Sequence, residues 1–152
     1  MTITVQAFVL CNSVRIDETS RNTDILGVFD IVLVKRFPAT HTNCAVYARL
    51  HLWDEPGASL SIAMETPEMT KRQLLAPMEA KPDLNGRVKL ICRIERLALP
   101  KEGIYTLQLA VNGKTRSEYL VTAVSDGACV LPRPNTQQTP DGRDQDFCTA
   151  QQ

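Results

Sequence analysis

A row of side chains suited to molecular recognition stands between residues 47 and 53. Tyr47, Arg49, His51 and Trp53 occupy alternate positions, and alternate side chains of a β-strand point to the same face. Aromatic rings and guanidinium groups are frequent at the centres of binding surfaces. The row therefore predicts a binding platform for a sugar ring, a peptide or another subunit. Two alternatives stay open: a loop or the chain's own tail covers the row, or the strand is buried on both faces.

Groups that would support catalysis are sparse. The chain has two histidines, His41 in a polar segment and His51 in the row, and neither lies in a recognisable motif. Cys11 and Cys92 sit in hydrophobic segments that favour the neutral thiol, so we interpret them as small apolar core residues and not as nucleophiles. We expect no catalytic residues and a protein that is not an enzyme.

The sequence does not predict a metal or cofactor site. The five cysteines form no Cys-x-x-Cys pair and no cluster with histidine, so neither a zinc site nor a disulfide framework is indicated. Asp17 and Asp30 flank a predicted hairpin and could face each other as half of a calcium site. The ligand spacing of a calcium loop does not accompany them, and we interpret them as turn-stabilising or solvated acids. Glycine-rich phosphate loops and nucleophile elbows are missing as well.

Composition narrows the class of partner. Lysine plus arginine and aspartate plus glutamate both number 17, so the formal net charge is zero and no charge imbalance suggests nucleic acid or a membrane surface. No stretch approaches the roughly 20 apolar residues of a membrane span, and the N-terminal residues lack the basic leader of a signal peptide. We expect a cytoplasmic interaction or assembly module that binds a protein partner or itself. The alternative is a domain that binds a small ligand, such as a carbohydrate, through the 47–53 row.

The elements that position these side chains are β-strands. Apolar residues occupy every second position in 88–94 and in 105–111, which predicts two strands with one buried face each. Asn112-Gly113 predicts a type I′ turn, because both central residues of that turn need positive φ. We expect residues 119–124 to fold back antiparallel onto 105–111.

The first half of the chain predicts two hairpins. One joins 44–53 to 60–64 through a turn, with inward side chains at Val46, Ala48, Leu50 and Leu52. The other joins the apolar segment 5–11 to a long strand at 25–36 that has a bulge at Gly27. Residues 37–42 are predicted as a loop, and the proline-rich stretch 66–87 as irregular except for a short strand near 73–76.

About seven to nine short strands and no long helix predict an all-β fold, an antiparallel immunoglobulin-like β-sandwich over residues 1–125. A length of 152 residues with 43% hydrophobic content suits one such domain. Residues 126–152 hold few large apolar groups and several prolines. We predict that this segment is a disordered tail, because it cannot bury enough surface to offset the entropy of ordering.

Two blocks of the chain carry a family resemblance. AFVLCNSVRIDETSRNTDILGVFDIVLVKRFPATH (Ala7–His41) and LALPKEGIYTLQLAVNGK (Leu97–Lys114) resemble a family of small bacterial proteins known only as a domain of unknown function. The resemblance implies a β-sandwich and no established activity, so no functional residue is carried over. In addition, Gly103-Ile-Tyr105 is similar to the tyrosine corner of immunoglobulin-like sandwiches, in which the Tyr hydroxyl bonds backbone a few residues upstream. Lys101 stands where many such domains have Asp.

Overall fold

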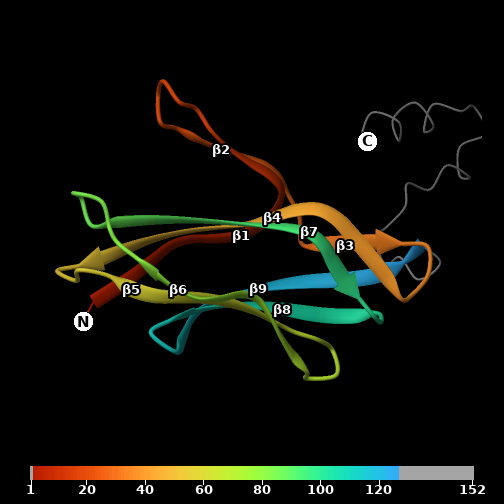
Figure 1. Ribbon diagram of the computed structural model, residues 1–152. Coiled ribbons are helices and arrows are strands. Elements are labelled where there is room, and N and C mark those ends of the chain that lie inside the picture. Colours follow the sequence, from red (N-terminus) through yellow and green to blue (C-terminus); the bar gives the residue numbers. More distant parts are fainter. Residues whose placement is uncertain (1, 127–152) are drawn as a thin grey trace, which may run out of the picture.

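Alternating apolar residues place nine strands in two layers. The computed structural model describes residues 2–126, and Figure 1 shows the two sheets one above the other. The strands in chain order are β1 (Thr2–Ile16), β2 (Thr23–Val28), β3 (Ile31–Val34), β4 (Ala39–Trp53), β5 (Ala58–Glu65), β6 (Lys71–Ala80), β7 (Arg87–Leu99), β8 (Gly103–Val111) and β9 (Lys114–Ser125). The all-β prediction is confirmed, and the strand count lies at the top of the predicted range.

The strands divide into a four-stranded sheet, in the order β2-β1-β4-β7, and a five-stranded sheet, in the order β3-β9-β8-β5-β6. One cluster of buried side chains contains residues from both sheets, among them Val46, Leu50, Leu107 and Leu109. The inward faces predicted for β4 and β8 are therefore confirmed. Burying both inner faces against each other removes the largest apolar surface of each sheet from water.

The predicted pairing of 44–53 with 60–64 is wrong. β4 lies in the four-stranded sheet and β5 in the five-stranded sheet, so the link between them crosses from one layer to the other. Both strands bury their apolar faces in the shared core. Alternation alone cannot distinguish two neighbours in one sheet from two strands that face each other across a core.

The predicted long strand at 25–36 is also divided. β2 pairs with β1 in the four-stranded sheet, whereas β3 pairs with β9 in the five-stranded sheet. The β3–β9 pair is parallel, so the prediction of a wholly antiparallel sandwich is wrong at this edge. No bulge occurs at Gly27, because the β1–β2 register is continuous there. Gly27 instead has φ +69° and lies against the Asn12 side chain, where a Cβ would collide.

Two more segments are more regular than predicted. β4 begins at Ala39, so most of the predicted loop at 37–42 is strand paired with β7. β6 runs over ten residues instead of the four expected, and it is an edge strand, the position in a sheet that tolerates a proline such as Pro77. A register shift in the β5–β6 pair accompanies it.

The β8–β9 hairpin is confirmed. Val111 pairs with Lys114, and the two residues between them, Asn112 and Gly113, have φ of 52° and 82°, as a type I′ turn requires. The predicted disordered tail lies, apart from Asp126, outside the described residues.

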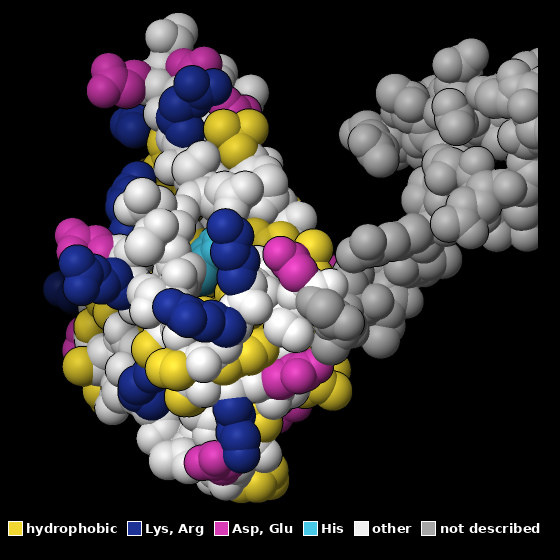
Figure 2. Space-filling view, turned by 90° about the vertical axis from the view of Figure 1, so that its right-hand side faces the viewer, with side chains coloured by type: hydrophobic (Ala, Val, Ile, Leu, Met, Phe, Trp, Pro, Cys, Tyr) yellow, Lys and Arg dark blue, Asp and Glu magenta, His cyan; other side chains and the backbone are white. Residues whose placement is uncertain are grey.

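The β1–β2 hairpin stands out from the sandwich. β1 pairs with β4 as far as Cys11 and thereafter with β2 alone. Residues 12–28, here called the arm, therefore extend this sheet beyond β4 and β7. Figure 1 shows the arm projecting from the layer that contains β1, β4 and β7. Figure 2 shows the same projection from another side, with acidic and basic side chains at its end. A cleft lies between the arm and the outer face of the four-stranded sheet.

Candidate functional site

The predicted 47–53 row lies on the outer face of the four-stranded sheet, but its members differ in exposure. Tyr47 is only 4% exposed, whereas Trp53 is 50% exposed. Val9 of β1 and Ile91 of β7 flank Tyr47 in register, and the arm adds Val14 and Ile25 to the same apolar cluster. For Tyr47 the alternative of a covered row therefore holds, because the arm packs over its ring.

His51 and Trp53 form a separate pair at the end of β4. Their rings are stacked with centroids 3.8 Å apart and planes 5° from parallel, and Trp53 Nε1 donates to Thr4 Oγ1 at 3.2 Å. The imidazole thus covers one face of the indole. The two rings border a hollow of about 510 Å³ together with the loop at 82–86, in which Gly86 has φ +75° and leaves no room for a Cβ beside His51.

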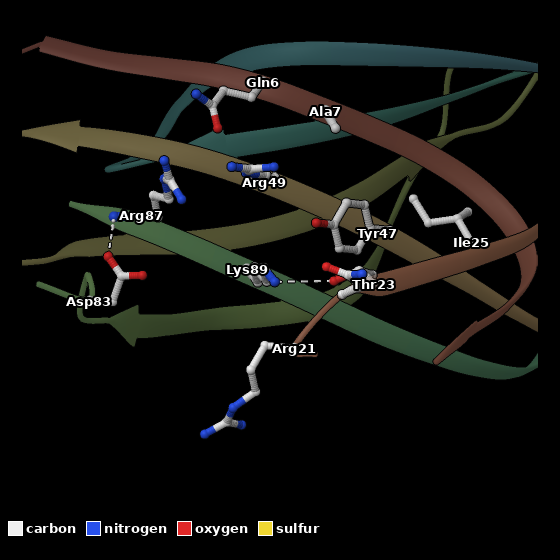
Figure 3. Close-up of a pocket in the computed structure, with 11 residues that line it drawn as sticks. Gln6, Ala7, Arg21, Thr23, Ile25, Tyr47, Arg49, Asp83, Arg87 and Lys89 are labelled. Atoms are coloured by element: carbon white, nitrogen blue, oxygen red, sulfur yellow. Dashed lines mark hydrogen bonds between the residues drawn. The ribbon is translucent and has the colours of Figure 1, made fainter. Parts of the chain in front are cut away.

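Arg49 belongs to a larger cleft between the arm and the sheet, with a volume of about 920 Å³. Figure 3 shows residues of neighbouring strands around one opening, with Tyr47 and Ile25 beside them. The lining residues come from β1, the arm, β4, the 81–86 loop and β7: Gln6, Ala7, Arg21, Asn22, Thr23, Ile25, Tyr47, Arg49, Asp83, Arg87 and Lys89. Four of them are cations and one is a carboxylate, in a chain whose formal net charge is zero.

Two of these cations face each other directly. Arg49 and Lys89 are register partners across the β4–β7 pair, and His51 and Arg87 are the next pair on the same face. Like charges opposite each other in a sheet are destabilising. Lys89 Nζ donates to Thr23 Oγ1 at 3.2 Å, which leaves its charge unneutralised, and Arg49 Nε is buried with no hydrogen-bond partner. The fold therefore holds an unfavourable charge pair at the centre of the cleft.

The carboxylate of Asp83 forms no ion pair with Arg49 or Lys89 in the described residues. Its Oδ1 accepts the backbone N–H of Arg87 at 2.9 Å and of Asn85 at 2.8 Å. These two hydrogen bonds, with smaller contributions from the charges of Arg87 and His51, hold the pKa of Asp83 below its usual value. Asp83 thereby shapes the loop that leads into β7. Among the described residues, the ion pairs are Arg15–Asp24 and Lys101–Glu68, neither of which involves a cation of the cleft.

The acids and histidines considered for chemistry lie apart. Asp17 caps the turn of the arm by accepting the backbone N–H groups of Thr19 and Ser20, so its interpretation as a turn-stabilising acid is confirmed. Asp30 lies between β2 and β3, and its C=O accepts the N–H of Thr122. His41 lies in β4 against the ring of Phe29. No cluster of His, Cys, Asp or Glu suited to a metal ion occurs in the described part of the chain.

The cysteines of the described residues are core residues. Cys11, Cys44 and Cys92 are all free and buried, as predicted for Cys11 and Cys92. Burial raises the pKa of the Cys44 thiol to about 11, and the nearby Cys11 and Cys92 add to the shift. Burial likewise raises the pKa of Cys11 and of Cys92. A raised pKa disfavours the thiolate that a nucleophile needs.

Sequence reasoning identified Tyr47 and Arg49 but missed the other members of the cleft. Arg87 and Lys89 carried a signal, since they occupy the polar positions of an alternating strand. What the sequence did not reveal is that this strand pairs with β4. Arg21 lies in a polar turn of the arm, and nothing local predicts that the turn approaches the sheet.

Comparison with known proteins identifies the family. The model of a family of unknown function, DUF6941, matches residues 6–123, which is most of the described chain. The chain belongs to this family. The resemblance inferred from the two sequence blocks is thus confirmed, and the likeness to immunoglobulin domains stays a prediction.

Two further similarities were found. Golgi apparatus protein 1 of Gallus gallus is 33% identical over 97 residues, which are 62% of this chain and 8% of that protein, so the chain spans less than a tenth of this curated relative. The structure of a Pseudomonas fluorescens alkylpurine DNA glycosylase, AlkC, bound to DNA with an abasic site analog, matches 80% of this chain and 30% of its own with a TM-score of 0.48 and 5% identity. Among the described residues, no helix is both long and apolar enough to cross a membrane.

Proposed function

We propose that this protein is a non-catalytic binding module that receives an anionic group of its partner in the cleft between the arm and the four-stranded sheet. The register of Arg49 with Lys89 carries the proposal. Two like charges in register lower stability. An anion bound between them would be attracted by both side chains and would offset their mutual repulsion. Guanidinium and ammonium groups are the side chains that bind carboxylates and phosphates most strongly.

The surroundings of the two cations support the same interpretation. Arg21 and Arg87 bring further positive charge to the opening, so a bound anion would meet donors from three parts of the chain. Tyr47 and Ile25 form a packed apolar wall beside it, and such a wall lowers the local dielectric and strengthens charge pairing. The proposal includes no catalytic step, because the cationic groups bind anions and Asp83 is engaged with backbone N–H groups.

The test is a titration followed by NMR, with citrate, inorganic phosphate and poly-L-glutamate as probes. We expect shifts of amide signals from the cleft that weaken as salt is added. The variant Arg49→Gln/Lys89→Gln should lose at least about tenfold in affinity, the effect of roughly 1.4 kcal/mol. Lys114→Gln/Arg116→Gln is the matched control, because both residues are exposed on β9 of the other sheet. Equal losses in both variants, or no binding of any probe, would refute the proposal.

A further inference from the structure

The four-stranded sheet ends at β7, and the second edge of this strand is open. Both backbone groups of Arg87 are directed away from β4, since its N–H bonds the Asp83 side chain and its C=O accepts the N–H of Asp83. By the period of two, the N–H and C=O groups of Lys89, Ile91 and Arg93 also point to the outer edge. Within the described residues, no backbone hydrogen bond satisfies them.

The open stretch has a defined start and end. At one end, the backbone N–H and C=O groups of Arg87 are already hydrogen-bonded to Asp83. At the other end Arg72 of β6 donates from Nη2 to the C=O of Ala98 at 3.0 Å. Between these two contacts lie the outward backbone groups of Lys89, Ile91 and Arg93. A groove of about 670 Å³, lined by 80–83 and 87–89 among others, lies at the start of this edge and shares Arg21, Asp83, Arg87 and Lys89 with the basic cleft.

On the side of the core, β7 is slightly less completely buried than its neighbour β4. The inward side chains of β7, Val88, Leu90, Cys92 and Ile94, are 5–9% exposed, whereas Val46, Ala48 and Leu50 of the neighbouring β4 are 0% exposed. A further strand beside β7 would cover this remaining apolar surface, as the second neighbour of a central strand does.

The side chains of β7 select the kind of strand that fits. On the outer face the open stretch presents Lys89, Ile91, Arg93 and Glu95 in sequence, with Ile91 half-buried between two exposed cations. Lys89 and Arg93 each hold one hydrogen bond toward the arm, to Thr23 Oγ1 and to the C=O of Val14. A second copy of β7 placed antiparallel and centred on Ile91 would set Lys89 against Arg93 twice. The attractive pair of Arg87 with Glu95 in the same register would require the backbone of Arg87, which is already bonded to Asp83. Like charges in register oppose such pairing, whereas acidic side chains at the same positions would favour it.

We propose that β7 accepts a fifth strand from an extended acidic segment of a protein partner. The pattern that fits is acidic-x-apolar-x-acidic, with the two carboxylates opposite Lys89 and Arg93 and the apolar side chain opposite Ile91. This inference rests on the proposed function, because the carboxylate beside Lys89 lies next to the basic cleft. Backbone hydrogen bonds supply affinity in strand addition, and alternate side chains supply specificity.

The test uses synthetic peptides with the core Glu-Thr-Val-Thr-Glu, flanked by Thr-Gly at both ends, and the full-length protein. We expect binding to slow hydrogen exchange at the amides of Lys89, Ile91 and Arg93. The amides of Leu90 and Cys92 already bond to β4 and should change little. A peptide with Lys in place of both Glu residues should bind at least about tenfold more weakly, as expected when attraction becomes repulsion.

Methylation of single peptide nitrogens separates strand addition from charge attraction. Alternate N–H groups of an added strand face β7, so methylating one that faces it should cost at least about tenfold in affinity. Methylating the next nitrogen, which faces away, should have much less effect. If neither methylation mattered while poly-L-glutamate still bound, strand addition would be refuted and the anion cleft retained. If no anionic probe bound, both would fail. A single-stranded oligonucleotide that bound in place of the peptide would also overturn the inference.

Discussion

The hydroxyl of Tyr105 bonds both backbone groups of Lys101. It donates to the C=O at 2.6 Å and accepts the N–H at 3.1 Å, which confirms the predicted bond to backbone a few residues upstream. Lys101 replaces the frequent Asp without loss of this contact, because only its main chain takes part. Its side chain instead reaches Glu68 at 2.7 Å, and Gly103 is packed against Pro67 with no room for a Cβ.

Replacing Tyr105 by Phe should lower the free energy of unfolding by roughly 1–3 kcal/mol, because two hydrogen bonds that usually contribute about 0.5–1.5 kcal/mol each would be lost. The ring would keep its place in the core, where Tyr105 is fully buried, and only the link to the β7–β8 loop would be lost. Urea unfolding followed by Trp53 fluorescence measures the change. A neutral result would show that water satisfies the Lys101 backbone equally well.

Leu107→Ala on the same strand provides a reference value with which the cost of Tyr105→Phe is compared. Leu107 is 0% exposed, so its truncation should cost roughly 2–5 kcal/mol through lost burial and the cavity left behind. The same unfolding curves measure it. A cost below that of Tyr105→Phe would contradict the packing described for the inner face of β8.

Tyr47 and Trp53 should respond differently to substitution by Ser, although both belong to the 47–53 row. Tyr47→Ser should destabilise by about 3 kcal/mol or more, since it empties a packed site beneath the arm. Trp53→Ser should cost about 1 kcal/mol or less, because the indole is half exposed and loses chiefly its stack on His51. Thermal melts followed by circular dichroism compare the two. Equal costs would show that the arm does not cover Tyr47 in solution.

Lys89→Glu should increase stability and remove anion binding at the same time. The new carboxylate would face Arg49 in register, and an opposite-charge pair across strands contributes roughly 0.2–1 kcal/mol. Chemical unfolding and the poly-L-glutamate titration measure the two effects. Lys114→Glu is the control. It changes the net charge by the same amount, but the register partner of Lys114 is the uncharged Val111. A loss of stability with binding intact would argue against the charge conflict at the cleft.

Stability should decrease in alkali because of Cys44. Its pKa in the folded protein is raised from the ordinary 9.0 to about 11, so the folded state keeps the proton that the unfolded state releases. The stabilisation is complete below pH 9 and is lost as pH rises through 11. Unfolding free energies measured between pH 7 and 11 with reductant should decrease less steeply for Cys44→Ala than for the native chain. Parallel curves would assign the decrease to other groups.

Local pattern predicted the parts of the fold that depend on near neighbours. The inward residues of β4 and β8, the positive φ at Asn112 and Gly113, and the hydroxyl bond of Tyr105 all follow from alternation, turn geometry or a short motif. Each involves residues within a few positions of one another or the choice between two faces of one strand. Such features are determined by the residue types at those positions and their immediate neighbours.

Pairing between distant segments was decided only by the tertiary structure. Residues 25–36 carry one apolar pattern, yet β2 and β3 enter different sheets, and the pattern does not specify the partner strand of either. Arg49 and Lys89 become neighbours only through the β4–β7 register, and Tyr47 is covered only because the arm folds over it. The sequence by itself determined most of the strand positions and which faces of β4 and β8 are apolar. The cleft and the open edge of β7 depend on which strands pair, and many pairings satisfy the same alternation.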